Sequence, residues 1–329
     1  MSDFPIILEK ALAARAGLFD PGRRSAFRLF NGFTEGCPDL VVDLYASTLV
    51  IHNYAEIPEQ GTQLVREAQA LLQAELPWLK AGILKTRNGP SAGEKRGRLL
   101  FGDSPDDRIL ENGVWYALDL TMNRDASLYL DTRGLRSWAL RNLAGKAVLN
   151  TFAYTGSLGV AAQAGGAARV AQADLNRRFL DLAKTSYTLN GFPIRKADFL
   201  TGDFFDLVAR LKRARERFDC VFVDPPFFSA TPKGTVDLSN SARLINKVRP
   251  LIEDGGRLVA INNALYVSGR EYMNSLETLC VDGYLRVAEL IPVSEDFTGY
   301  PATRLGAPIT DPAPFNHSTK IAVLEVRRK

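Results

Sequence analysis

Hydrophobic residues follow two different patterns along the chain, and the change falls near residue 112. Before it, short apolar runs separated by turn residues predict an antiparallel meander of strands. Residues 60–76 have apolar positions at helical spacing, and residues 81–87 form a further short apolar run. We therefore expect an N-terminal helix and linker over residues 1–24, followed by a small α+β domain over residues 25–112. This domain is a candidate for RNA binding.

From residue 113 to residue 329, apolar runs of strand length alternate with segments of helical periodicity. This alternation predicts an α/β fold with a doubly wound, Rossmann-like parallel sheet. Two late runs, LRVAELI and KIAVLEV, are separated by a long connection and suit an antiparallel edge. The segment LYLDTR also alternates as a strand would, ahead of an expected helix over residues 131–143.

Composition and charge narrow the class of protein. The 329 residues are 46% hydrophobic and 24% charged, which is ordinary for a globular chain. A net charge of only +4 requires any nucleic-acid surface to be a local patch. Three scattered cysteines show no metal-ligand spacing and favour a reducing compartment. No apolar run is long enough to span a membrane, and the N-terminus does not resemble a signal peptide. We expect a cytoplasmic protein without a metal.

The first expected parallel strand ends in NTFAYTGSLG, residues 150–159. This is not G-x-G-x-x-G, which counts against a classical NAD site. Gly156 still offers a strand-to-helix turn whose backbone N–H groups could hold a carboxylate. Open α/β sheets bind ligands at this edge, so the sequence predicts a ligand at the carboxyl ends of the strands.

An acid stands at the end of each of the next three strands: Asp174, Asp203 and Asp224. Asp174 lies about 20 residues beyond the first strand, where an acid can bind ribose hydroxyls. Asp203 could accept from an adenine amine, and Phe204 could pack on the ring. A single acid here is usually a helix N-cap. Three acids together with DPPF favour a bound nucleoside instead.

Several segments resemble a known family: FRLFNGFTEGCPDLVVDLYASTLVIH, ASLYLDTRGLR, VLNTFAYTGSLGVAAQAGGA, QADLN, LAKTSYTLNG and VFVDPPFF. They are similar to class I S-adenosylmethionine-dependent methyltransferases. Over about residues 26–329 the chain resembles bacterial 23S rRNA methyltransferases that act on cytosine C5 or guanine N7. Many of those proteins carry an N-terminal RNA-binding barrel, and here about 24 residues of helix and turn stand in its place.

The resemblance implies S-adenosylmethionine as cofactor, RNA as partner and a specific set of binding residues. Tyr129, Asp131 and Arg133 would lie beside the methionine end, Asp174 would bind the ribose, and Asp203 with Phe204 the adenine. The full cofactor set comprises Tyr129, Asp131, Arg133, Asn150, Phe152, Tyr154, Thr155, Gly156, Asp174, Leu175, Asp203, Phe204 and Asp224.

The segment Asp224-Pro225-Pro226-Phe227 predicts the catalytic platform. Methyl transfer is an in-line displacement, so the acceptor atom must be held in alignment with the departing sulfur. Two prolines fix the backbone and leave carbonyls free to accept from an amine. Phe227 would stack on a flipped base, and Asp224 would receive an N–H or contact the cofactor.

The position of the cysteines decides between the acceptor atoms. Cytosine C5 has no lone pair, so a thiolate must first add to the ring. After the fifth strand, where relatives carry that cysteine, this chain has Asn262-Asn263, and Cys220 lies inside a strand. The sequence therefore favours a purine nitrogen resembling guanine N7, with Asn262 as a candidate contact to the base. The alternatives are a cytosine-C5 rRNA enzyme, a methyltransferase for a protein amide or small molecule, and a non-catalytic binding scaffold.

Two groups of basic residues are candidates for contact with RNA phosphates. The first group comprises Lys85, Arg87, Lys95, Arg96 and Arg98 around a glycine-rich loop expected to be exposed, and the second comprises Lys212, Arg213, Arg215 and Arg217 before the DPP strand.

The long proline-rich segment 296–319 contains Arg304 and His317, which could line the substrate side.

Overall fold

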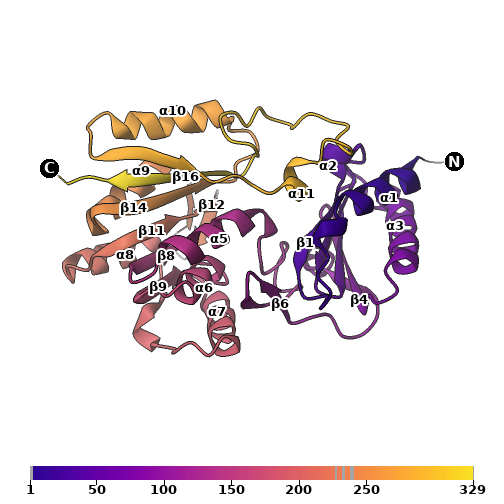
Figure 1. The fold of residues 1–329 in the computed structure, drawn as a ribbon, viewed down its shortest axis with the longest axis horizontal. Coiled ribbons are helices and arrows are strands. Elements are labelled where there is room, and N and C mark those ends of the chain that lie inside the picture. The colour runs from indigo at the N-terminus through magenta and orange to yellow at the C-terminus, as the bar shows by residue number, and fades with distance from the viewer. Residues whose placement is uncertain (1–2, 227, 232–233, 238–240, 329) are drawn as a thin grey trace. The chain divides into compact units, whose positions relative to one another are not determined.

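A computed structural model describes residues 3–226, 228–231, 234–237 and 241–328. The chain forms two compact units (Figure 1). The first comprises Met1–Leu130 and Ser294–Pro308, and the second comprises Asp131–Val293 and Ile309–Lys329.

The first unit contains a five-stranded sheet in the order β1-β2-β3-β4-β5. The strands β1, β2 and β3 form the antiparallel meander that the sequence predicts. Strand β4 runs parallel to β3, and this step uses the helix α3 as its crossover. The bounds are β1 (Ala26–Asn31), β2 (Leu40–Tyr45), β3 (Thr48–Asn53), α3 (Thr62–Glu75), β4 (Ala81–Thr86) and β5 (Arg98–Phe101).

Apolar residues of this sheet, such as Phe27 and Leu29 on β1, pack with residues of α1 and α3, such as Leu8 and Leu72. The unit also holds a hairpin of β6 and β7. Its remaining elements are α1 (Phe4–Ala14), η1 (Ala16–Leu18), α2 (Gly32–Glu35), η2 (Pro58–Gly61), α4 (Ala92–Arg96), β6 (Arg108–Glu111), β7 (Val114–Ala117) and α11 (Glu295–Thr298).

The first unit is larger than the range 25–112 expected from the sequence, and specific contacts explain the additions. Arg15 follows α1 and forms an ion pair with Glu35 at 2.9 Å, both side chains being fully buried. The same guanidinium donates to the carbonyl of Asp296, which brings in residues 294–308. Tyr45 donates its hydroxyl to the carbonyl of Leu128, which holds the segment after the hairpin. These long-range bonds cannot be read from local periodicity.

The second unit is built on a seven-stranded sheet in the order β10-β9-β8-β11-β14-β16-β15. The first five strands in this order are parallel, as predicted, and β16 is antiparallel to both of its neighbours. The bounds are β8 (Ala147–Thr151), β9 (Arg169–Asp174), β10 (Phe199–Thr201), β11 (Phe218–Val223), β14 (Ile252–Asn262), β15 (Leu285–Leu290) and β16 (Lys320–Val326).

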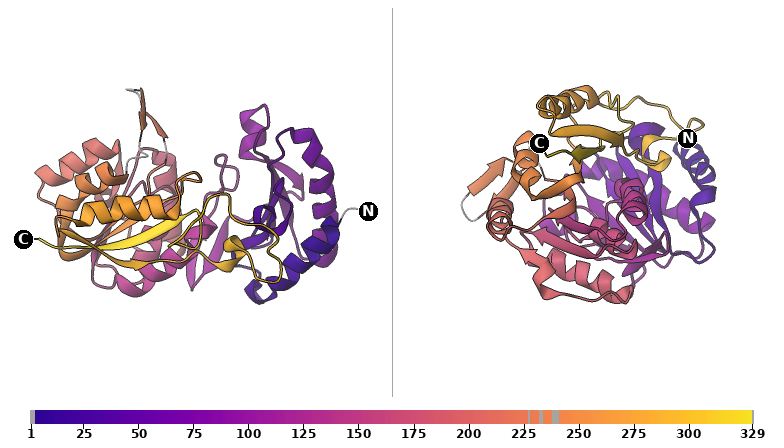
Figure 2. Two further views of the ribbon diagram at one scale, coloured as in Figure 1. Left: turned by 90° about the horizontal axis from the view of Figure 1, so that it is seen from above. Right: turned by 60° about the vertical axis from the view of Figure 1, so that its left-hand side comes forward.

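Helices cover both faces of this sheet (Figures 1 and 2). Side chains of α5 and α6 join one core cluster, and side chains of α8, α9 and α10 join the other. The bounds are η3 (Leu130–Thr132), α5 (Arg133–Asn142), α6 (Ser157–Ala164), α7 (Arg177–Leu189), η4 (Lys196–Asp198), α8 (Phe204–Arg213), α9 (Ser241–Val248), η5 (Arg249–Leu251) and α10 (Gly269–Cys280). The doubly wound α/β prediction is confirmed.

Two local predictions are wrong. LYLDTR is not a strand, because Leu130–Thr132 forms a 3-10 turn that leads directly into α5. The glycine-rich segment after Arg87 contains the helix α4, which has a capping box between Ser91 and Glu94, and the strand β5. Beyond the DPP segment, β12 (Phe228–Thr231) and β13 (Gly234–Asp237) pair as an antiparallel hairpin that projects from the second unit (Figure 2).

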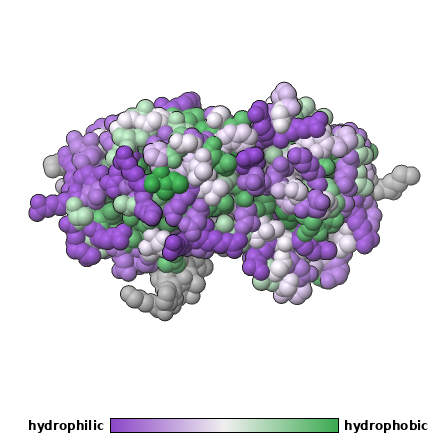
Figure 3. Space-filling view, turned by 90° about the horizontal axis from the view of Figure 1, so that it is seen from below, coloured by the Kyte–Doolittle hydropathy of each residue, from purple (hydrophilic) through white to green (hydrophobic). Residues whose placement is uncertain are grey.

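Among the described residues, no helix has the length and apolar character needed to cross a membrane. On the face drawn in Figure 3, hydrophilic and hydrophobic residues are interspersed.

Candidate active site

The topological switch point of the second unit lies between β8 and β11, which are neighbours in the sheet. From β8 the chain continues to β9 and β10 on one side, whereas β14 lies on the other side of β11. The hydroxyl of Thr151, the last residue of β8, donates to the carbonyl of Phe222 at 2.6 Å. This bond ties the two strands together where ligands of open α/β sheets bind.

The loop after β8 has an unusual backbone. Phe152, Tyr154 and Gly156 all have positive φ, at 52°, 50° and 76°. A side chain at Gly156 would come within 2.6 Å of the Cβ of Ala183, so only glycine fits without a shift. Backbone strain of this kind is concentrated at ligand sites, and the binding role of this loop stays a prediction.

A buried hydrogen-bond chain supports the loop from within the sheet. The side-chain amide of Asn150 donates to Gln172 at 2.9 Å, and Gln172 donates to the carbonyl of Gly156 at 3.1 Å. Asn150 is only 1% exposed. It therefore acts on the loop through Gln172, which differs from the direct cofactor contact that the resemblance implies.

Asp174 ends β9 and lies against the same loop. Its carboxylate accepts from the backbone N–H of Tyr154 and of Asn176, each at 2.8 Å. Burial raises the pKa of Asp174 despite these bonds. Each oxygen accepts only one of the two bonds, so lone pairs remain that could accept from ribose hydroxyls.

Asp203 is the N-cap of α8, which is the common role of an acid after a strand. Its Oδ1 accepts from Phe205 N–H at 2.9 Å and from Asp206 N–H at 3.3 Å, so Oδ2 takes no part in the cap. Next to it, the ring of Phe204 stacks on Phe152 with centroids 4.7 Å apart. The capping role and the predicted adenine contact are therefore compatible.

Asp224 directly follows β11 and is half-buried. Burial, with a smaller contribution from the negative charge of Asp131, raises the pKa of Asp224 to about 7. Asp131 in turn accepts a hydrogen bond at 2.6 Å from the hydroxyl of Thr319. Two carboxyl groups thus lie in one part of the site, and the hydroxyl of Thr319 donates to one of them.

The rest of the predicted platform is only partly described. Pro225 is partly exposed and Pro226 is exposed, whereas Phe227 lies outside the described residues. Asn262 ends β14, and its Oδ1 accepts from the backbone N–H of Ala264 at 3.1 Å. This is the loop-capping role, and it leaves the amide –NH₂ as the group that could contact a base.

For four predicted cofactor residues, the position in the structure says less about a role in binding. Tyr129 belongs to the first unit, where its hydroxyl donates to Asp125 at 3.3 Å. Arg133 begins α5 in the second unit and is partly exposed. Thr155 is buried at 5% exposure, and Leu175 is 40% exposed directly after Asp174. Their roles stay predictions of the resemblance.

The donor and acceptor set fits S-adenosylmethionine. The cofactor combines a ribose, an adenine and a methionine part that carries an ammonium and a sulfonium. Asp174 supplies acceptors for hydroxyls, and Phe152 with Phe204 supplies an aromatic wall. Asp131 and Asp224 repel one another in the absence of a cation, and a cationic group nearby would relieve this repulsion.

None of the three cysteines lies at the carboxyl ends of β11 or β14. Cys220 lies inside β11, paired with Val148 and Arg257, and burial raises its pKa. Cys37 lies in the first unit, where burial raises its pKa to about 11. Burial also raises the pKa of Cys280.

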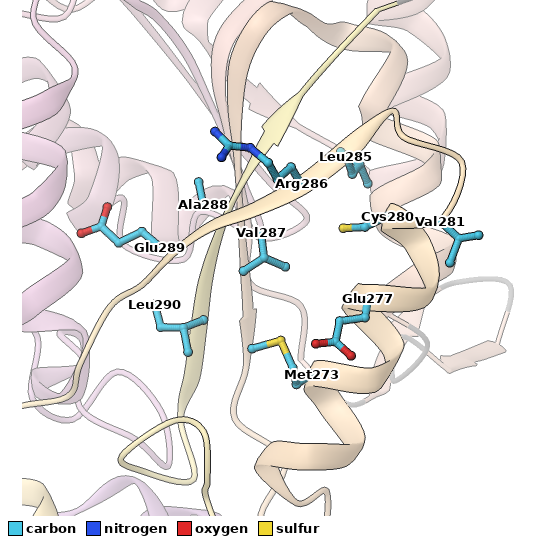
Figure 4. Close-up of a pocket in the computed structure, with 10 residues that line it drawn as sticks. All are labelled: Met273, Glu277, Cys280, Val281, Leu285, Arg286, Val287, Ala288, Glu289 and Leu290. Carbon is cyan, nitrogen blue, oxygen red and sulfur yellow. The ribbon is translucent and has the colours of Figure 1, made fainter.

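Cys280 lines a pocket of about 680 Å³ between α10 and the edge strand β15 (Figure 4). Met273, Val287 and Leu290 line the same pocket and pack against the core below it. The pocket is formed by the outer strand of the sheet rather than by the ends of β8 and β11. It therefore belongs to the sheet edge and not to the switch point.

The basic residues are not all on the surface. Lys85 is fully buried, and its ammonium donates to the carbonyls of Arg96 and Asn123, so the expectation that it contacts RNA is wrong. Arg87 pairs with Asp125 at 2.8 Å. Arg96 and Arg98 are exposed. Arg304 and His317 belong to different units. Arg304 donates to the carbonyl of Gly306, and His317 Nδ1 accepts from the backbone N–H of Thr319.

Sequence reasoning missed Thr319 and Lys320, which precede and begin β16. Lys320 is fully buried and donates to the carbonyls of Ala264 and Ser318 at 2.9 and 2.6 Å. It therefore braces the loop after Asn262, and burial lowers its pKa to about 8. The only signal was a Ser-Thr-Lys run directly before an apolar strand, which is typical of many strand starts.

Comparisons with known proteins find chains similar in sequence and in structure. A methyltransferase solved in complex with SAH superimposes with a TM-score of 0.83 at 22% identity, over 98% of this chain and 81% of that one. "Ribosomal RNA large subunit methyltransferase I" of Photobacterium profundum is 30% identical over 255 residues, 77% of this chain. The protein of the same name from Aeromonas salmonicida is 28% identical over 306 residues, 89% of this chain.

The aligned part covers 62% of the length of the Photobacterium protein and 76% of the Aeromonas one. The S-adenosylmethionine-dependent methyltransferase family matches residues 28–285. This match extends over most of the chain and includes the switch-point loop, Asp174, Asp203 and the DPP segment. The chain therefore belongs to the S-adenosylmethionine-dependent methyltransferase family.

Proposed function

We propose that this enzyme transfers a methyl group from S-adenosylmethionine to RNA, specifically to a purine nitrogen of large-subunit rRNA that resembles guanine N7. Two relatives named as large-subunit rRNA methyltransferases support the choice of substrate. The choice of atom rests on one observation: no cysteine stands at the carboxyl end of β11 or β14, since Cys220 lies inside β11, Cys280 at the sheet edge and Cys37 in the other unit.

The chemistry of the acceptor explains why this observation matters. A cytosine ring must be activated at C5 by addition of a thiolate, and each of the three thiols has a raised pKa that disfavours the thiolate. Guanine N7 already presents a lone pair in the plane of the ring. It needs alignment with the methyl group, and neither a nucleophile nor a strong base.

The residues at the strand ends have separate tasks in this proposal. The cofactor supplies an electrophilic methyl group on a sulfonium. Asp174 holds the ribose, and Asp131, supported by Thr319, holds the positive methionine end. The rigid Pro225-Pro226 backbone and the carboxyl of Asp224 offer acceptors to a base amine. The side-chain oxygen of Asn262 already accepts from the backbone N–H of Ala264. The –NH₂ group of the same side chain is therefore the part that can donate to a base carbonyl.

The test is transfer of labelled methyl from S-adenosylmethionine to total RNA, separated ribosomal subunits and a protein extract in parallel, followed by nucleoside mass spectrometry. The proposal expects 7-methylguanosine in large-subunit RNA. An Asp174→Asn variant serves as the matched control with impaired cofactor binding. Label in 5-methylcytidine would refute the assignment of the atom, and label in protein alone would refute RNA as the substrate.

A further inference from the structure

A continuous strip of aromatic and basic side chains lies on the first unit. It starts at α2, passes the ends of β3 and β4, and reaches α4 and β5. Ring contacts join its aromatic members to Arg87, and hydrogen bonds join Arg87 to Arg124. Arg96 and Arg98 follow on α4 and β5 of the same unit. We call it the basic–aromatic strip, and define it as Phe33, Tyr54, Arg87, Arg96, Arg98 and Arg124.

The aromatic end of the strip is held in a fixed orientation. Phe33 meets Tyr54 edge-on, with ring centroids 4.9 Å apart and an interplanar angle of 76°. On Tyr54, the guanidinium of Arg87 lies 5.3 Å from the ring centroid. Phe33 is 37% exposed. An exposed ring fixed by a second ring behind it loses little conformational entropy when a planar ligand stacks on it.

The basic end is fixed by the buried ammonium of Lys85. It donates to the carbonyl of Asn123 at 3.0 Å and also to that of Arg96, so it joins α4 to the segment 123–125. Next to it, Arg87 donates to the carbonyl of Arg124 at 2.9 Å. Lys85 therefore acts as an internal support, and the arginines around it face outward.

The charge of the strip is positive and accessible. Arg96, Arg98 and Arg124 are exposed, and none forms an ion pair with an acid within the part of the chain that the structure describes. Arg87 is the exception, because it pairs with Asp125. Arg124 donates to the carbonyl of Arg87 but keeps its charge without an acidic partner. Exposed, positively charged guanidinium groups and an exposed ring on one unit match a polyanion with planar groups, which is the chemistry of an unpaired nucleic-acid strand.

We propose that the basic–aromatic strip binds a single-stranded segment of the RNA substrate, with one base stacked on Phe33 and the phosphates along Arg96, Arg98 and Arg124. This proposal rests on the proposed function, since it assumes an RNA substrate. A stacked base must be free of its own duplex, so a helical RNA offers the phosphates but not the ring face. An acidic protein surface would use the arginines and leave Phe33 without a role.

The stacking part is tested with a fluorescently labelled single-stranded RNA oligonucleotide and fluorescence anisotropy. Phe33→Ala should weaken binding about 5-fold to 100-fold, because stacking on an aromatic ring contributes at this scale. Phe33→Tyr should restore most of the affinity. The matched control is Tyr284→Ala in the second unit, a ring of 36% exposure that also carries an arginine, Arg249, at 5.2 Å. It should leave RNA binding unchanged.

The electrostatic part is tested by the salt dependence of the same binding. Replacing Arg96 and Arg98 together by alanine should reduce the slope of log K against log salt by about 1.4, at about 0.7 per phosphate contact. The control replaces Lys10 and Arg66, which are exposed on α1 and α3 of the same unit. An equal change in slope for both pairs would show general attraction and would overturn the proposal.

The remaining outcomes separate this proposal from the proposed function. If wild-type protein methylates RNA and Phe33→Ala binds the oligonucleotide as tightly as wild type, the strip proposal fails alone. Equal loss of affinity for a duplex RNA in Phe33→Ala would also refute stacking. If wild type binds and methylates no RNA but labels protein, both proposals fail together. Cofactor affinity, measured by calorimetry, should stay unchanged in every strip variant.

Discussion

Asp224 lies close enough to Asp131 for the charge of one carboxyl to raise the pKa of the other, in addition to the larger effect of burial. Asp131 receives a hydroxyl donor from Thr319. Near pH 7 the carboxyl of Asp224 therefore readily takes a proton, while Thr319 holds the carboxylate of Asp131 in place.

Binding of the cationic cofactor should release a proton below pH 7. The pKa of Asp224 is about 7 without a cation, and a positive group nearby lowers it. The affinity should therefore rise as pH rises toward 7, by up to about tenfold per pH unit, and level off above it. Calorimetry in buffers of different ionisation enthalpy measures the released proton. Asp224→Asn should abolish the release, and Asp254→Asn, at an exposed site, should not.

The same carboxyl should make the ligand-free protein less stable as pH rises. A carboxyl whose pKa is raised from 3.8 to about 7 disfavours the folded state once it must ionise. Its contribution to the free energy of unfolding is unchanged below about pH 4, decreases between pH 4 and 7, and is constant above 7. Denaturant titrations of wild type and Asp224→Asn at pH 5 and pH 7.5 should show the smaller pH dependence in the variant. Equal pH dependence in both proteins would contradict it.

Removing the hydroxyl of Thr319 should weaken cofactor binding. Thr319→Val keeps the shape of the side chain but deletes the 2.6 Å hydrogen bond to Asp131. A bond of this kind contributes about 1 kcal/mol, so the dissociation constant should rise about fivefold. Thr185→Val, at an exposed position on α7, is the control. A cofactor affinity equal to that of wild type would show that Thr319 does not position Asp131.

Gly156 allows backbone strain and steric exclusion to be separated. An alanine at Gly156 has φ of 76° and would also meet Ala183 at 2.6 Å. At Gly191, φ is 70° but nothing lies within 4 Å of the added Cβ. Gly191→Ala should therefore cost about 1 kcal/mol of unfolding free energy, from strain alone. Gly156→Ala should cost more and should also reduce cofactor affinity at least tenfold, by calorimetry.

Methyl transfer should not depend on any thiol. Cys37→Ala and Cys280→Ala should retain activity within about twofold, and Cys220→Ala should lose about 1 kcal/mol of stability because its side chain is fully buried. Activity is read as labelled nucleoside per enzyme at a temperature where each variant is folded. Loss of transfer in one folded cysteine variant would restore cytosine-C5 chemistry as the explanation.

Much of the fold follows from local sequence. The helices α3 and α5 begin and end within two residues of the expected ranges 60–76 and 131–143, because apolar spacing is a local signal. The position of β16 between β14 and β15 is not local. It depends on pairing over many residues, and periodicity predicts a strand without predicting its neighbours.

The site was predictable to a similar degree. We could predict Asp174, Asp203 and Asp224 as candidate binding residues from their positions at strand ends, because parallel strands bring their carboxyl ends to one edge of the sheet. Burial was not predictable: Lys85 and Asn150 are inside the protein although both are polar residue types. Their partners are carbonyl and amide groups distant in sequence, which no local pattern reveals.

The first unit includes residues 294–308, so the chain passes from one unit to the other at residues 130, 293 and 308. Glu35 receives hydrogen bonds from Arg15 and, at 2.6 Å, from Thr303. A gene fragment ending at residue 130 would encode every strand of the small sheet but would leave this fully buried carboxylate with one donor fewer. Neither unit can therefore be inherited, exchanged or excised as a single uninterrupted stretch of chain.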